Sequence, residues 1–319
     1  MLENLTHYFN TIPSAHRAFI LAGGIAFFWL VEGGIPLFRF GYNKWKHAGL
    51  NLFFTLTTII INFAFATLIV RGSDWSIQHE WGLLPWLGLS GWTQLIVGLL
   101  LLDLVGAYFI HWIEHKIKVL WKFHMIHHAD TMVDTTTANR HHPGESVFRA
   151  IFTLLGVLIC GAPMWLVMLY QSISALLSQF NHANIRLPKS LDRAISYIIV
   201  SPDMHKIHHH VTRPQTDSNF GNIFAIWDRL FGTFNVTPIE QIQYGLDVLP
   251  DGQFLPPMDL TCVEKDVAAR IKEAFKGERH LIIGRTANIT VPHEGRPGCQ
   301  FRNKCWLGCP FGGYFSTQS

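Results

Sequence analysis

Residues 111–142 read HWIEHKIKVLWKFHMIHHADTMVDTTTANRHH and contain seven histidines. In a helix, side chains three or four positions apart lie on the same face. His111 and His115 would therefore share one face, and the same rule groups the next three histidines, which are His124, His127 and His128. The spacing predicts two sets of imidazoles that point in the same direction.

A third histidine-rich segment, MHKIHHH at 204–210, repeats the second spacing with His205, His208 and His209. Twelve of the eighteen histidines of the chain lie between positions 111 and 210. One buried histidine is usually a core residue, but burying eight or more without partners would cost roughly 1–3 kcal/mol each. Neutral imidazole is a common ligand of iron, zinc, copper and nickel. Eight to ten imidazoles exceed the coordination of one ion, so the count favours two metals.

The composition is that of a membrane protein, because 49% of the 319 residues are hydrophobic and only 15% are charged. About 20 apolar residues suffice to span a bilayer. Three runs meet that length, at Ala18–Phe38, Gly49–Val70 and Trp92–Ile110. A fourth run, Phe148–Gln179, is interrupted at 161–163 by Gly-Ala-Pro, which predicts a helical hairpin in the membrane. We expect an all-α integral membrane protein with about four transmembrane helices, namely three spans plus the hairpin.

The charges next to the spans predict the orientation. Arg39, Lys44 and Lys46 follow the first span, whereas Arg71 is the only Lys or Arg in the loop after the second. The positive-inside rule therefore places residues 39–48 and the histidine segments on the cytoplasmic side. Residues 1–16 carry no basic region before the first apolar run, so we expect that run to be retained as an anchor.

Two acidic residues fall inside the predicted spans, Glu32 and Asp103. Charged groups at such depth usually face the protein interior. Asp103 precedes His111 by two helical turns, so it is a candidate to orient a ligand or shape a substrate path, with a structural hydrogen bond as the alternative. Glu114 and Asp203 flank histidine motifs and are candidates for the same orienting role.

The motifs HWIEH, HMIHH, TTANRHHP, FNHANIRLP, SPDMHKIHHH and NFGNIFAIWDRLFGTF occur in that order between Asp103 and Phe234. Together they resemble the fatty acid hydroxylase and sterol desaturase superfamily of membrane di-iron oxygenases. The resemblance implies two irons, with Asn184 near the site and neither His141 nor His210 assigned a role. It implies as ligands His111, His115, His124, His127, His128, His142, His182, His205, His208 and His209.

The last part of the chain differs in composition, and four of the five cysteines lie in its final sixty residues. The segment GRPGCQFRNKCWLGCPFGGYFSTQS at 295–319 resembles an internal fragment of the glucose-methanol-choline oxidoreductase family, whose glycine-rich nucleotide motif does not precede it. We expect residues 1–260 to form the membrane domain, with its histidine motifs at 103–234. For 261–319 we expect a fragment-like tail without an independent function.

The apolar spans, the histidine motifs and the resemblance they carry together predict a multi-pass membrane oxygenase that hydroxylates or desaturates a lipid with O2. Its di-iron site would lie in a histidine-rich cap on the cytoplasmic face. Zinc is a possible substitute for iron, because nitrogen sites bind it at least as tightly. Electrons would come from an external reductase with a ferredoxin or cytochrome, and we expect no nucleic-acid partner.

Two other classes of protein remain open. HWIEH fits the H-x-x-E-H order of a zinc hydrolase with Glu114 as the base, although a catalytic zinc takes only three protein ligands. A metal transporter would place its ligands along a permeation path, near the middle of the membrane.

Overall fold

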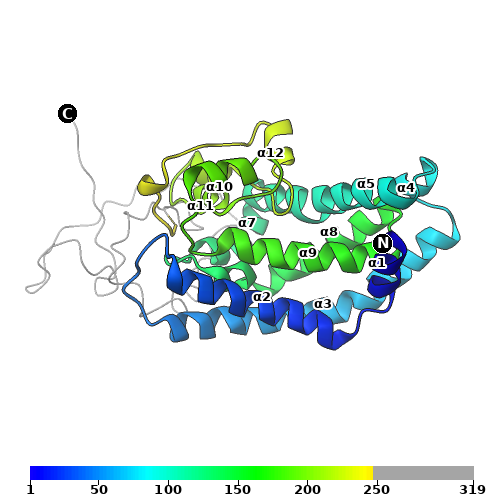
Figure 1. The fold of residues 1–319 in the computed structure, drawn as a ribbon, viewed down its shortest axis with the longest axis horizontal. Coiled ribbons are helices and arrows are strands. Elements are labelled where there is room, and N and C mark those ends of the chain that lie inside the picture. The colour runs from blue at the N-terminus through cyan, green and yellow to red at the C-terminus, as the bar shows by residue number, and fades with distance from the viewer. Residues whose placement is uncertain (247–319) are drawn as a thin grey trace, which may run out of the picture.

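The computed structural model describes residues 1–246, in which helices are the only regular secondary structure. Long helices run side by side along one axis, and short helices gather at both ends (Figure 1). The α-helices are α1 Leu2–Asn10, α2 Ser14–Gly34, α3 Lys44–Gln78, α4 Leu83–Trp86, α5 Gly91–Asp103, α6 Ile110–Lys116, α7 Lys118–His128, α8 Pro143–Cys160, α9 Met164–His182, α10 Lys189–Ile195, α11 Pro202–His208 and α12 Ile226–Leu230. The shorter turns are a π-helix, η1 Leu104–Phe109, and three 3-10 helices, η2 Thr135–Asn139, η3 Gln215–Asp217 and η4 Ile239–Gln241.

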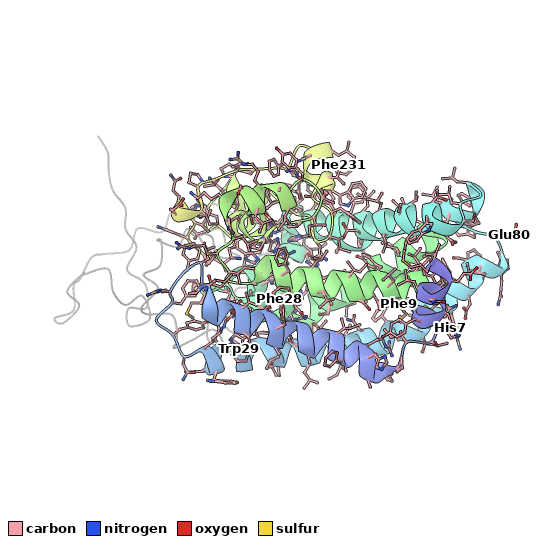
Figure 2. The ribbon with its side chains drawn as sticks, in the orientation of Figure 1. His7, Phe9, Phe28, Trp29, Glu80 and Phe231 are labelled. Carbon is pink, nitrogen blue, oxygen red and sulfur yellow. The ribbon has the colours of Figure 1, made fainter. Side chains whose placement is uncertain are left out.

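Four helical stretches of the described residues are long and apolar enough to cross a membrane, which confirms the predicted all-α membrane architecture. They are Ser14–Gly34, Lys44–Trp86, Gly91–Lys116 and Pro143–Cys160. The outer faces of α2 and α3 expose large apolar side chains such as Phe19, Leu30 and Phe63. Figure 2 shows such side chains projecting outward along these helices, where lipid would cover them.

The predicted hairpin is formed by α8 and α9, and its turn lies at Gly161. This residue has φ 70° and ψ 40°, the left-handed conformation that commonly ends a helix. A Cβ atom there would come within 2.3 Å of the Trp81 carbonyl oxygen, so the turn also needs the small residue for packing. Pro163 then serves as the N-cap residue of α9.

The apolar core lies between α5, α8 and α9, and it is lined by buried residues such as Leu102, Val157 and Leu166. Phe9 of α1 also belongs to this core, and it lies at the end of the bundle that carries the N-terminus (Figure 2). The histidine-bearing helices α7 and α11 lie toward the opposite end (Figure 1). The long helices therefore support a separate polar cap, in which the histidine motifs are buried.

Glu32, predicted to face the interior, connects α2 to this cap. It is 3% exposed, and its Oε1 accepts hydrogen bonds from the backbone N–H groups of Thr135 at 2.7 Å and Asn184 at 2.8 Å. Its Oε2 pairs with Lys44 at 3.1 Å. One carboxylate thus fixes the chain on both sides of the cap, at η2 and after α9.

The loop between α7 and α8 is held against α3 by a second buried set of polar groups. His47 Nε2 lies 2.9 Å from the Asp130 carboxylate, and its Nδ1 lies 3.2 Å from Asp134. Asn51 donates to the hydroxyl of Thr136 at 2.8 Å. These contacts immobilise the segment that follows His128, so they also fix the end of α7.

We predict that Glu32→Ala lowers the thermal unfolding temperature of the detergent-purified protein, because it leaves two buried backbone N–H groups without an acceptor. Each such group costs about 1–3 kcal/mol. Glu3→Ala, at an exposed position of α1, is the matched control and should leave the unfolding temperature unchanged. Equal unfolding temperatures for the two variants would contradict the role of Glu32.

Candidate metal centre

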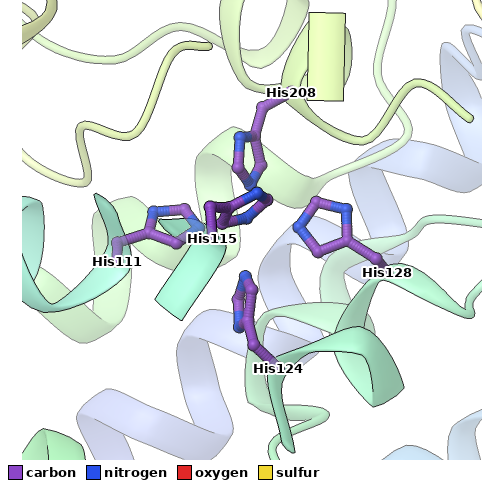
Figure 3. A group of neighbouring side chains, drawn as sticks. All are labelled: His111, His115, His124, His128 and His208. Atoms are coloured by element: carbon purple, nitrogen blue, oxygen red, sulfur yellow. The ribbon is translucent and has the colours of Figure 1, made fainter. Parts of the chain in front are cut away.

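Five buried histidines from α6, α7 and α11 converge on one point. Each offers a ring nitrogen within 4.8 Å of the others, and Figure 3 shows the five rings surrounding a common centre. We call this set the first histidine group; it contains His111, His115, His124, His128 and His208.

The outward nitrogens of two of these rings are held by backbone carbonyls. His111 Nδ1 donates to the carbonyl of Phe220 at 2.8 Å, and His208 Nδ1 donates to that of Ser218 at 2.7 Å. A carbonyl oxygen only accepts hydrogen bonds, so each Nδ1 carries the proton. The Nε2 atom of each ring then has a free lone pair, and both Nε2 atoms are buried without a protein partner.

Carboxylates hold two further rings of the group. His124 Nδ1 lies 2.8 Å from Glu145 Oε1, and His115 Nδ1 lies 3.3 Å from Asp217 Oδ1. Their Nε2 atoms are likewise buried without a protein partner. Holding the outer nitrogen of an imidazole by an acceptor is how proteins fix the tautomer and direction of a metal ligand.

Four other buried histidines form the second histidine group, which contains His127, His182, His205 and His209. The Nε2 atom of His182 lies 3.1 Å from that of His127 and 3.0 Å from that of His205. His182 Nδ1 donates to the carbonyl of Ser178 at 2.7 Å, so its Nε2 presents a lone pair to these two neighbours. A cation between the rings would satisfy all three.

The two groups are adjacent. The rings of His128 and His209 are stacked with centroids 4.7 Å apart, and those of His205 and His208 are 5.2 Å apart. Each H-x-x-H-H motif contributes to both groups. The motif of α7 supplies two histidines to the first group and one to the second, and the motif that begins in α11 supplies one to the first and two to the second. The structure thus divides sets that the sequence analysis treated as single clusters.

Burial keeps these imidazoles neutral. It lowers the pKa of His124, His127 and His128 well below the usual value, and neighbouring imidazoles lower it further. The pKa of His208 falls to about 4 because of burial, although its hydrogen bond to the Ser218 carbonyl opposes the shift. Neutral rings keep the lone pair that a metal needs. Both groups therefore have the burial, protonation and free nitrogens of imidazole metal sites.

His142, which we expected among the ligands, lies in neither group. It is the N-cap residue of α8, its Nδ1 accepts a hydrogen bond from Gly144 N at 3.0 Å, and its ring stacks on Phe123. Its neighbour His141, to which we assigned no role, stacks instead on His127 of the second group, with ring centroids 5.0 Å apart. The two consecutive histidines thus stack on different side chains.

Asp103 and Glu114 act through other residues. The Asp103 carboxylate accepts hydrogen bonds from the backbone N–H groups of Ile223 and Phe224 and from the indole N–H of Trp227 at 3.0–3.2 Å. It therefore holds the segment that carries the Phe220 carbonyl. Glu114 is paired with Arg149 at 2.6 Å, and its Oε2 lies 3.6 Å from His124 Nδ1.

The two remaining site candidates are Asn184 and Asp203. Both ends of the Asn184 amide bind the backbone of Phe38, at 2.9 and 2.8 Å. Asp203 lies beside Asp192 at the start of α11, where burial and that neighbouring carboxylate raise its pKa to about 6. No hydrogen bond or ion pair described for residues 1–246 joins either side chain to a histidine of the two groups.

Lys206, which the sequence analysis did not select, is fully buried between ligand candidates of α11. Its Nζ donates to the carbonyls of Asn181, at 3.4 Å, and Ala183. These carbonyls flank His182 at the end of α9, where a cation is favourable. Lys206 therefore fixes His182 relative to His205. The sequence signal that could have identified Lys206 is its position inside the MHKIHHH motif.

We predict that His208→Ala lowers the bound metal per chain and that His142→Ala leaves it unchanged. The first change removes a nitrogen that faces the first histidine group, and the second removes a ring that belongs to neither group. The measurement is elemental analysis of the two purified variants beside the unaltered protein. Full metal content in His208→Ala would exclude His208 as a ligand, and a loss in His142→Ala would restore His142 to the set.

The sequence profile of the fatty acid hydroxylase family matches residues 95–233, which contain all nine grouped histidines. Ornithine lipid hydroxylase OlsE of Rhizobium tropici is 26% identical over 145 residues, which are 46% of this chain and 43% of that protein. Alkylglycerol monooxygenase of Xenopus tropicalis is 30% identical over 168 residues, 51% of this chain and 34% of that protein.

Very-long-chain aldehyde decarbonylase GL1-11 of Oryza sativa subsp. indica is 24% identical over 155 residues, 48% of this chain and 58% of that protein. The chain thus spans less than two thirds of the length of each of these relatives. No solved structure matches it significantly. Four apolar helices and the matched profile mark an integral membrane protein. Residues 95–233 therefore match the fatty acid hydroxylase family, as the order of the histidine motifs indicated.

Proposed function

We propose that this chain is a membrane-bound di-iron oxygenase that hydroxylates or desaturates a lipid with O2 and external electrons. The observation that carries the proposal is the pair of adjacent, buried histidine groups beside an apolar helix bundle. The similar proteins support it, because their names describe a hydroxylase and a monooxygenase that act on lipids.

In this proposal each group holds one iron through its inward ring nitrogens. The pair of irons, when bound, would supply oxygen activation and removal of hydrogen from an unactivated C–H bond. Neutral imidazole suits iron, and zinc remains a possible substitute because nitrogen sites bind it at least as tightly. We retain His111, His115, His124, His127, His128, His182, His205, His208 and His209 as the proposed ligands and omit His142.

The remaining polar residues orient the ligands and keep water away. Asp103 supports the segment whose carbonyls bind His111 and His208, while Asn184 fixes the chain after His182. Glu114 stabilises Arg149 next to His124. The residues around the two groups are largely buried, so a lipid would reach the irons from the membrane side while bulk water is excluded.

We further propose that the histidine-bearing end faces the cytoplasm, where Arg39, Lys44 and Lys46 lie after the first span. An external reductase with a ferredoxin or cytochrome would deliver electrons there. Residues 1–260 would form the membrane oxygenase domain, with its histidine motifs at 103–234. The fragment-like tail expected at 261–319, including its likeness to glucose-methanol-choline oxidoreductases, lies outside the described residues.

The two alternative classes fit the geometry less well. In a zinc hydrolase Glu114 would activate a water molecule, but its carboxylate is paired with Arg149. The group that contains His111 and His115 also offers five imidazoles, more than the three protein ligands of a catalytic zinc. A transporter would need ligands along the bundle, whereas these histidines are grouped in the cap.

The test is turnover by the full-length protein in lipid nanodiscs made from a natural lipid extract, with ferredoxin, ferredoxin reductase and NADPH. The iron-loaded protein should consume O2 only when NADPH is added, and mass spectrometry should find a lipid that has gained one oxygen atom or lost two hydrogen atoms. The same protein loaded with zinc is the control and should be inactive. If the zinc-loaded protein hydrolysed lipid and the iron-loaded protein took up no O2, the oxygenase proposal would be wrong and the hydrolase would be favoured.

A further inference from the structure

Glu145 is a buried carboxylate that the proposed function does not yet use. It lies in the first turn of α8 and is 1% exposed. Its Oε1 is 2.8 Å from His124 Nδ1, 2.7 Å from His141 Nδ1 and 2.9 Å from Arg149 Nε. Three donors therefore converge on a single oxygen atom.

This oxygen is connected to both histidine groups. His124 belongs to the first group, and its Nε2 is buried without a protein partner. His141 stacks on His127 of the second group with an interplanar angle of 18°. Glu145 thus contacts one ring of the first group, His124, directly and is linked to one ring of the second, His127, through His141.

A third metal bound by His124, His141 and Glu145 is the other interpretation of the same cluster. The guanidinium of Arg149 argues against it, because its Nε already donates to Oε1 of the Glu145 carboxylate. A second cation at the same carboxylate would be repelled by the first. The cluster is therefore a set of hydrogen bonds on a charged acceptor, and such bonds are the stronger kind.

We propose that Glu145 is the positioning residue that couples the two metal positions. It fixes the His124 tautomer so that Nε2 faces the first histidine group, and it holds His141 against His127 of the second. The proposal rests on the proposed function, because it requires that both groups bind metal. Residues that hold a metal ligand from behind typically affect metal affinity or activity by about 10–100-fold.

The test compares Glu145→Gln and Glu145→Asp with the unaltered full-length protein, using Co²⁺ as a spectroscopic probe of both positions. Glutamine keeps the size of the side chain but loses its charge, whereas aspartate keeps the charge but ends one carbon short of His124. We expect both variants to bind Co²⁺ about 10–100-fold more weakly in competition with a chelator. The absorption bands of the bound cobalt should also shift. Glu240→Gln, at an exposed ion pair, is the control and should match the unaltered protein.

A merely structural role would lower the unfolding temperature of the metal-free variants without moving the cobalt bands. Unchanged cobalt bands and unchanged cobalt affinity in both Glu145 variants would overturn the positioning role. Binding of two cobalt ions by the unaltered protein in the same experiment would still support the two metal positions of the proposed function. If the unaltered protein itself bound no cobalt in either group, the proposed function would fail together with this inference. Should Glu145→Gln not fold, the spectrum of Glu145→Asp alone decides the matter.

Discussion

The burial of nine imidazole rings in one cap is the constraint on which the rest of this structure depends. An unsatisfied polar group in such surroundings costs roughly 1–3 kcal/mol, and the protein satisfies one nitrogen of several rings from outside. Phe220 and Ser218 supply carbonyls, and Glu145 supplies a carboxylate. The nitrogens that remain lie within 4.8 Å of one another in each group, an arrangement that a bound cation would satisfy.

The groups that accept hydrogen bonds from the outer ring nitrogens must also stay in place, and buried carboxylates hold the segments that carry them. Asp103 binds the segment after α11 to α5, and Asp228 accepts hydrogen bonds from the N–H groups of Phe220 and Gly221. Glu32 binds η2 and the end of α9 to α2. Acidic residues near the membrane helices thus act as anchors for the cap, and the apolar bundle gives these anchors a rigid base.

Much of the fold was predictable from local chemistry. Apolar runs of sufficient length indicated the spans, and Gly161 with Pro163 indicated the hairpin because a helix cannot continue through them. Helical spacing also predicted which histidines approach each other within a motif. It could not predict that α7 and α11 each divide their histidines between two groups, because that division depends on how the helices cross.

The choice between His141 and His142 was beyond the sequence for a similar reason. The two are adjacent, and their contacts in the fold, of His141 with His127 and of His142 with Phe123, join residues that the sequence alone does not bring together. Glu145 and Lys206 were overlooked because each acts through a partner that is distant in the sequence: Glu145 through His124, and Lys206 through the carbonyls at the end of α9. Glu145 was still visible as an acid four residues after His141.

Anomalous X-ray diffraction at the iron absorption edge tests the central claim most directly, because it locates each iron relative to the histidines. Crystals of the iron-loaded chain should give two peaks, one surrounded by the first histidine group and one by the second. A single peak shared by the nine rings, or a peak between His141 and Glu145 in place of either, would contradict the two-site account.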